Sequence, residues 1–108
     1  MTYGFIVDAP VPAEVYDAVH AEVVRRAGDR VDGMLVHVAW ATGAGFRVLE
    51  VWESKEQCDR FEAAVVGPAM AQVAAGQPAE GPEPAREEFE PRGLILAGMP
   101  APRPMTQA

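Results

Sequence analysis

Apolar residues recur along this chain in short runs that predict strands and helices. The clearest stretch covers residues 33–53, where valine, leucine, phenylalanine and tryptophan fill two runs on either side of a Thr-Gly-Ala-Gly cluster. β-Branched and aromatic residues bounded by glycines are typical of strands. A two-residue turn at Gly43-Ala44, in which Gly43 takes a positive φ, would join the two runs into a β-hairpin.

The register of the hairpin follows from this turn. If Ala41 pairs with Phe46, the ladder ends with a Leu35–Trp52 pair, and cross-strand partners share a face. One face then carries Leu35, His37, Ala39, Ala41, Phe46, Val48, Glu50 and Trp52. The other carries Met34, Val36, Val38, Trp40, Arg47, Leu49, Val51 and Glu53.

Neither face of the hairpin has the regular apolar–polar alternation of a sheet that meets water on one side. One face therefore needs helices, and the other needs a further cover. In a chain of 108 residues, the expected second cover is another copy of the chain. The hydrophobic pattern thus predicts a homodimer.

A strand and a helix precede the hairpin. Residues 2–8 alternate as a short strand that Pro10 and Pro12 end. Pro12 also suits the first position of a helix, and Gly28 suits the position just after its end. The helix is amphipathic, and its apolar stripe contains Tyr16, Val19, His20, Val23 and Ala27.

A helix and a strand follow the hairpin. Ser54 and Gln57 have capping-box spacing at the start of the helix. Gly67-Pro68 should break or kink it, with a short helix over residues 69–75 beyond the break. Residues 87–97 form the last strand, and the apolar residues 94–96 are its strongest part.

The resulting order, β–α–β–β–α–β, predicts an α+β, ferredoxin-like fold with a four-stranded antiparallel sheet and two helices on one face. We expect residues 1–98 to form a single domain. Residues 99–108 contain three prolines and are expected to form a disordered C-terminal tail.

Charge and composition limit the classes of partner and the location expected for the protein. The formal net charge of -7 disfavours nucleic acid, whose phosphates need a basic patch, and gives no attraction to anionic membranes. No apolar run approaches the ~20 residues of a membrane span. The first ten residues lack the basic segment of a signal peptide, so the expected location is cytoplasmic. One cysteine, Cys58, allows no internal disulfide.

The best candidates for chemistry are His37 and Glu50, which the register places opposite each other. A carboxylate can orient an imidazole and increase its basicity, as a general base for a phenolic substrate requires. The alternative is a structural pair at the dimer interface. The side chains expected to line a substrate pocket are Phe46, Trp52, Tyr16, His20 and Phe61. No metal site, phosphate loop or dinucleotide fingerprint is recognisable, so no cofactor is predicted.

The segment GFRVLEVWESKEQCDRF, an apolar strand ending in VWES and a capped helix carrying an aromatic residue, resembles dimeric α+β barrel proteins. It is most similar to small antibiotic-biosynthesis-monooxygenase-like (ABM-like) proteins, over roughly residues 3–97. The resemblance implies a homodimer with facing sheets and a hydrophobic pocket between sheet and helices in each subunit. It also implies, for some members, oxidation of polyketide-like aromatics without metal or flavin; others degrade haem or cyclise polyketides.

Two departures from the family pattern affect the inherited chemistry. Relatives often carry a histidine after the aromatic residue of the second helix, whereas Phe61 is followed here by Glu-Ala-Ala, which argues against haem degradation. Arg92-Gly93 stands where relatives often have a His-Asn pair. Three hypotheses follow: a cofactor-independent monooxygenase or cyclase that uses His37 as its base, a non-catalytic dimeric module that binds a hydrophobic ligand, and an interaction domain with a filled core.

Overall fold

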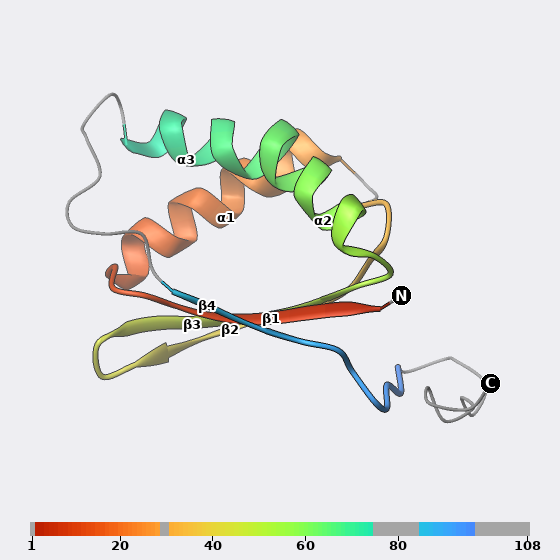
Figure 1. Ribbon diagram of the computed structural model, residues 1–108. Coiled ribbons are helices and arrows are strands. Elements are labelled where there is room, and N and C mark those ends of the chain that lie inside the picture. Colours follow the sequence, from red (N-terminus) through yellow and green to blue (C-terminus); the bar gives the residue numbers. More distant parts are fainter. Residues whose placement is uncertain (1, 29–30, 75–84, 97–108) are drawn as a thin grey trace.

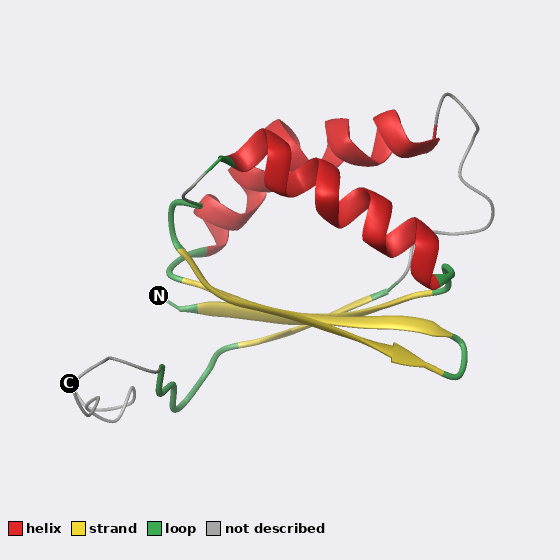
Figure 2. Cartoon of the chain, turned by 180° about the vertical axis from the view of Figure 1, so that it is seen from behind, coloured by secondary structure: helices red, strands yellow, loops and turns green. Residues whose placement is uncertain are grey.

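The structure, a computed structural model, describes residues 2–28, 31–74 and 85–96. The elements are β1 (Tyr3–Ala9), α1 (Ala13–Ala27), β2 (Met34–Thr42), β3 (Gly45–Trp52), α2 (Lys55–Phe61), the π-helical turn η1 (Glu62–Val66), α3 (Gly67–Ala74) and β4 (Arg86–Phe89). The strands form one antiparallel sheet in the order β2-β3-β1-β4, which confirms the predicted ferredoxin-like α+β fold. The helices cover one face of this sheet (Figures 1 and 2).

The predicted hairpin register is correct from the turn to Val36, and it includes the His37–Glu50 pair. The Leu35–Trp52 pair is wrong. An irregularity between Met34 and Val36 makes Trp52 pair with Met34 instead. An extra residue in one strand shifts the following side chains to the opposite face. Met34 therefore packs against the core beneath the helices, and not on the face of Val36 and Val38, where the predicted register placed it.

The turn of the hairpin also differs from the prediction. It does contain Gly43 and Ala44, but the positive φ belongs to Gly45, at +151°, and not to Gly43. At Gly45 a Cβ atom would overlap the carbonyl oxygen of Ala9 on the neighbouring strand. Glycine is needed where the hairpin approaches β1, so the constraint is set by tertiary contact and not by the turn itself.

The second helix begins as predicted and continues further than predicted. The Ser54 hydroxyl accepts a hydrogen bond from the backbone N–H of Gln57 at 3.2 Å. Gly67-Pro68 does not break the helix. The chain passes through η1, where the N–H of Gly67 donates to the carbonyl of Glu62 five residues back, and continues into α3. This wider turn accounts for Pro68, whose ring would clash with the preceding turn of a regular α-helix.

The last strand is shorter than predicted. β4 begins at Arg86 and ends at Phe89, and residues 94–96 are not in a strand. Pro91, which cannot donate to a ladder, follows the end of the paired segment. The Phe89 ring lies over Gly4 on the adjacent strand, so closely that a Cβ at Gly4 would meet it at 2.5 Å.

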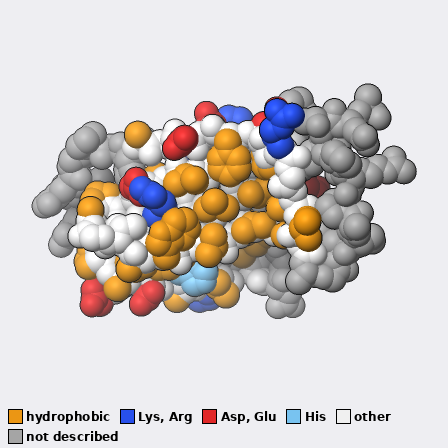
Figure 3. Space-filling model, turned by 90° about the horizontal axis from the view of Figure 1, so that it is seen from below, with side chains coloured by type: hydrophobic (Ala, Val, Ile, Leu, Met, Phe, Trp, Pro, Cys, Tyr) orange, Lys and Arg blue, Asp and Glu red, His pale blue; other side chains and the backbone are white. Residues whose placement is uncertain are grey.

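The two faces of the sheet carry different side chains. The core beneath the helices consists of Tyr3, Phe5, Trp52 and Cys58, all buried. On the opposite face, apolar partners align across β2, β3 and β1, and Val38 and Trp40 are 45% and 41% exposed. Figure 3 views this open face and shows hydrophobic side chains gathered over its centre.

The two neighbouring glycines of the hairpin provide a matched pair of mutations. We expect Gly45→Ala to lower the free energy of unfolding by about 1–3 kcal/mol, because a strained φ and a backbone overlap are imposed together. Gly43→Ala, which meets no atom within 4 Å, should change it by no more than ~0.5 kcal/mol. Urea unfolding of both variants measures the difference, and equal destabilisation would contradict this account of the turn.

Candidate active site

A chain of hydrogen bonds runs from the core to the surface on the helix-facing side of the sheet. It begins on β3, where Glu50 and Trp52 are two residues apart and point to the same face. The indole N–H of Trp52 donates to Oε1 of Glu50 at 2.9 Å. Trp52 is fully buried, and the side chain of Glu50 is 12% exposed. A core side chain thus holds the carboxylate through its single polar atom.

The adjacent edge strand, β2, supplies His37. Its Nδ1 atom lies 2.7 Å from Oε2 of Glu50, the length of a charge-assisted hydrogen bond. A carboxylate only accepts hydrogen bonds, so the proton in this contact is on Nδ1 of His37. In the neutral imidazole, Nε2 is then the acceptor. The pair predicted from the register is therefore present in the arrangement that a general base requires.

Helix α1 supplies the next two members of the chain. Tyr16 Oη lies 2.9 Å from Nε2 of His37 and 3.4 Å from Nδ1 of His20. Because Nε2 of His37 accepts, the Tyr16 hydroxyl donates to it, and its oxygen is left to accept from His20. His20 is exposed, so the chain ends at solvent.

Stacked rings hold the phenol of Tyr16 in this position. Its ring centroid lies 4.8 Å from that of Phe46, with an angle of 18° between the planes. It lies 5.6 Å from the ring of His20, which in turn stacks on His37 at 5.5 Å. These distances are typical of offset-stacked aromatic pairs. Tyr16 is thus positioned by packing as well as by its hydrogen bond.

The surroundings keep the phenol of Tyr16 protonated. Burial raises its pKa above the ordinary value, and the negative charges of Glu50 and Asp17 raise it further. Both effects disfavour the phenolate. Tyr16 therefore carries its proton at neutral pH and can donate it to His37.

The structure brings together most of the predicted site residues. The contacts described above join His37, Glu50, Tyr16, His20 and Phe46. Trp52 adds its indole N–H, but its ring lies in the core, where Phe61 packs against it at 5.5 Å. The catalytic and pocket roles of these residues stay predictions.

From the sequence Tyr16 is predicted only as a pocket wall, and its hydroxyl, which bonds His37, is not predicted. The available signal was the spacing of Tyr16 and His20, which are four residues apart and share one face of an amphipathic helix. That face had to meet the sheet. The spacing did not show which strand position would receive the hydroxyl.

A cavity of about 500 Å³ among the described residues lies away from this chain of hydrogen bonds. Its lining consists of Ile6, Asp8, Arg47, Ala85, Arg86 and Glu87. The strand register places Ile6, Asp8 and Arg47 on the open face, where Arg47 binds Asp8 at 2.7 Å. This cavity is not the predicted pocket beside His37, which stays a prediction.

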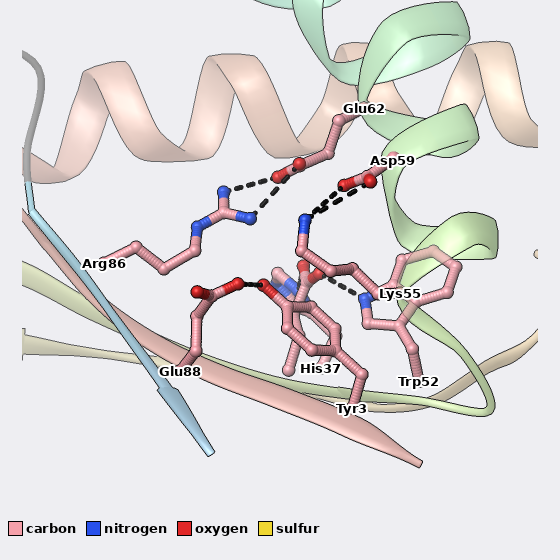
Figure 4. A network of polar contacts seen from close by, with 9 residues as sticks. Tyr3, His37, Trp52, Lys55, Asp59, Glu62, Arg86 and Glu88 are labelled. Atoms are coloured by element: carbon pink, nitrogen blue, oxygen red, sulfur yellow. Dashed lines mark hydrogen bonds and ion pairs between the residues drawn. The ribbon is translucent and has the colours of Figure 1, made fainter. Parts of the chain in front are cut away.

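A second polar cluster ties β4 to the helices and was not predicted. Arg86 donates to both carboxylate oxygens of Glu62, at 3.2 and 2.5 Å, and its guanidinium lies 3.9 Å from the ring centroid of Phe5. The Tyr3 hydroxyl donates to Glu88 at 2.6 Å. Figure 4 shows Arg86 and Glu88 on β4 facing these partners. The partners are far apart in sequence, so no local sequence pattern predicts the cluster.

Three potential metal ligands, Cys58, Asp59 and Glu62, have ligand atoms within 4.8 Å of one another. Each already has a structural explanation. Asp59 pairs with Lys55, and Glu62 pairs with Arg86. Burial raises the pKa of the Cys58 thiol to about 12, so the thiolate that a metal would need is disfavoured.

Comparisons with known proteins identify the fold class. No protein-family model matches the chain, and no curated protein does either. A structure from Chloroflexus aurantiacus named as an antibiotic biosynthesis monooxygenase has 21% sequence identity and a TM-score of 0.60, covering 91% of this chain and all of that one. A similarly named structure from Caulobacter crescentus has 18% identity and a TM-score of 0.58, covering 83% and 89%.

A third structure is SnoaB from Streptomyces nogalater, named as a cofactor-independent oxygenase, with 16% identity and a TM-score of 0.55. The match covers 87% of this chain and 94% of SnoaB. At such identities the likeness shows the fold. The chain is therefore an α+β, ferredoxin-like protein with the fold of ABM-like proteins, as the resemblance implied. No helix in the described ranges is long and apolar enough to cross a membrane.

Proposed function

We propose that this protein is a cofactor-independent monooxygenase that acts on a hydrophobic, hydroxylated aromatic molecule of the polyketide type. One observation carries the proposal: the hydrogen-bonded sequence Glu50–His37–Tyr16. It is an acid–base apparatus in which a carboxylate orients an imidazole and the imidazole faces a phenolic hydroxyl. The fold shared with SnoaB, named as a cofactor-independent oxygenase, supports the class of reaction.

The proposed chemistry requires only a base, a bound aromatic substrate and molecular oxygen. Removal of the hydroxyl proton by the His37 system leaves an electron-rich anion, and Glu50 stabilises the imidazolium that forms. That anion supplies the electrons for the reduction of O₂. O₂ reacts at a ring carbon conjugated with the ionised oxygen and gives a quinone. The substrate O–H bond and one ring C–H bond are lost, one oxygen atom forms the new carbonyl, and the other leaves as water with these two hydrogens.

The phenol of Tyr16 already forms a hydrogen bond with His37, the proposed base, and this supports a hydroxyarene as the substrate. The Tyr16 ring stacks on Phe46 while its hydroxyl meets Nε2 of His37. The stacked rings and the accepting oxygen of Tyr16 at the outer end of this chain of hydrogen bonds would bind an aromatic alcohol from outside. Apolar walls with few, well-placed polar groups are the usual composition of small-molecule sites.

We expect His37→Gln to lower oxygen uptake with a panel of hydroxylated anthracenes and naphthalenes by about 10²–10⁴-fold, the usual contribution of a general base. Glutamine keeps a polar group opposite Glu50 but cannot accept a proton at neutral pH. An oxygen electrode measures the rate, and circular dichroism checks that the variant is folded. Full activity in the variant would exclude His37 as the base. Thermal stabilisation of the wild-type protein by these compounds without oxygen uptake would instead favour a non-catalytic binding module.

We also infer that the protein works as a homodimer whose open sheet faces meet. The rows Val36–Val51, Val38–Leu49–Ile6 and Trp40–Arg47 run across this face, and they are mostly apolar. Among the described residues, no helix covers them, and Val38 and Trp40 remain well exposed. A contiguous apolar surface of this kind is typical of an interface between subunits. A second copy offers the same surface and can cover it symmetrically.

A charge at the centre of this face should prevent dimer formation. We expect Val38→Lys to produce a monomer in sedimentation experiments at ~10 μM, because the ammonium group would be desolvated without a partner. Val24→Lys is the matched control, since Val24 is 54% exposed on α1, away from the open face, and should leave the dimer intact. A monomeric wild-type protein, or a dimer in both variants, would contradict this assignment of the interface.

A further inference from the structure

Both ring nitrogens of His37 are occupied. Nδ1 is bonded to Glu50 at 2.7 Å, and Nε2 faces the Tyr16 hydroxyl at 2.9 Å. A general base needs a lone pair within hydrogen-bond reach of the proton that it removes. The lone pair of His37 is on Nε2 and is directed at Tyr16. A substrate hydroxyl therefore meets Tyr16 before it can meet His37.

Tyr16 is held in front of His37 by its packing. Its ring is stacked on Phe46, from β3, and on His20, one helical turn along α1. The ionisable groups around its hydroxyl are His20 and Asp17 on its own helix, His37 on β2 and Glu50 on β3. To uncover Nε2, the phenol would have to lose both its stacking and its hydrogen bond. Proton transfer through Tyr16 requires neither of these losses.

The weak contact in the chain is at its outer end. The Tyr16 oxygen is 3.4 Å from Nδ1 of His20, compared with 2.9 and 2.7 Å for the two inner bonds. Hydrogen bonds between hydroxyl groups are ordinarily shorter, at about 2.7–2.8 Å. A hydroxyl donor from solution can thus replace the exposed His20 as the hydrogen-bond donor to Tyr16, while the imidazole keeps its stacked position, and form a shorter bond with the same lone pair.

We propose that Tyr16 is the catalytic residue that contacts the substrate, and that it receives the proton of an aromatic hydroxyl while it passes its own proton to Nε2 of His37. This inference rests on the proposed function and names the group that performs its first step. The substrate O–H bond breaks and a new O–H bond forms on Tyr16. The former Tyr16 O–H bond breaks as an N–H bond forms on His37. The products are a substrate anion and an imidazolium held by Glu50, so net charge is conserved.

The same geometry restricts the substrate class. A proton that crosses Tyr16 must come from a group about as acidic as a phenol. Burial raises the pKa of Tyr16 itself, so an aromatic hydroxyl suffices as the donor, whereas an aliphatic alcohol, being far less acidic, would transfer its proton very slowly. The expected substrates are therefore hydroxyarenes, whose flat rings can also lie against the exposed imidazole of His20.

The test is the ionisation of bound 1-naphthol, followed by its ultraviolet absorbance without oxygen, in the wild-type protein and in Tyr16→Phe. In the wild-type protein we expect binding to increase the ionisation constant of the naphthol at least about tenfold, which is one pKa unit. Tyr16→Phe should abolish this increase while changing the dissociation constant by less than ~10-fold. His37→Gln should abolish it too. Tyr3→Phe is the matched control, because Tyr3 also donates to a carboxylate, Glu88, but lies outside the chain, and it should keep the increase.

Retention of the increase in Tyr16→Phe, or failure of the wild-type protein to bind or ionise the naphthol, would overturn the assignment of Tyr16. Oxygen uptake by the same samples in air separates this assignment from the proposed function. Ionisation that depends on Tyr16 but leads to no oxygen uptake by any hydroxyarene would support the role of Tyr16 and refute the oxygenase. Oxygen uptake that is equal in the wild-type protein and in Tyr16→Phe would support the oxygenase and refute the role of Tyr16.

Discussion

The indole N–H of Trp52 can only donate a hydrogen bond, and the rest of the site depends on where it does so. Trp52 is fully buried, and a buried N–H without an acceptor would cost about 1–3 kcal/mol. Glu50 is the acceptor. That bond fixes the carboxylate, the carboxylate fixes the proton on Nδ1 of His37, and the remaining nitrogen is thereby directed at Tyr16. One requirement of the core thus sets the direction of every later hydrogen bond.

The fold makes this order possible because it brings three elements to one point. β3 lies inside the sheet and supplies both Glu50 and Trp52 to the helix-facing side. β2 is an edge strand and places His37 beside Glu50 through the hairpin register. α1 crosses above them, and its side chains are partly or fully exposed, none of them buried. The chain of hydrogen bonds consequently passes from a buried indole to an exposed imidazole within one subunit.

Much of this could be predicted from the sequence, because the decisive signals were local. Alternation and turn residues predicted the hairpin and the His37–Glu50 pair, and the order of elements predicted the ferredoxin-like sheet. The errors came from local irregularities of the backbone and from contacts between distant segments. Leu35 forms a bulge that local alternation cannot reveal, Gly45 is constrained by Ala9, and Pro68 is accommodated by a π-helical turn. The hydroxyl of Tyr16 was missed for the same reason, since its partner lies across the helix–sheet interface.

The central claim is that the hydrogen bond from Trp52 to Glu50 sets the proton positions as far as Tyr16. The most direct test is ¹⁵N NMR of the histidine side chains in the wild-type protein, at an alkaline pH where imidazole side chains are neutral. The account predicts that neutral His37 is the Nδ1–H tautomer, with Nε2 unprotonated and acting as an acceptor. A neutral His37 that carries its proton on Nε2 would contradict the claim, because the imidazole would then donate to Tyr16 and could not act as its base.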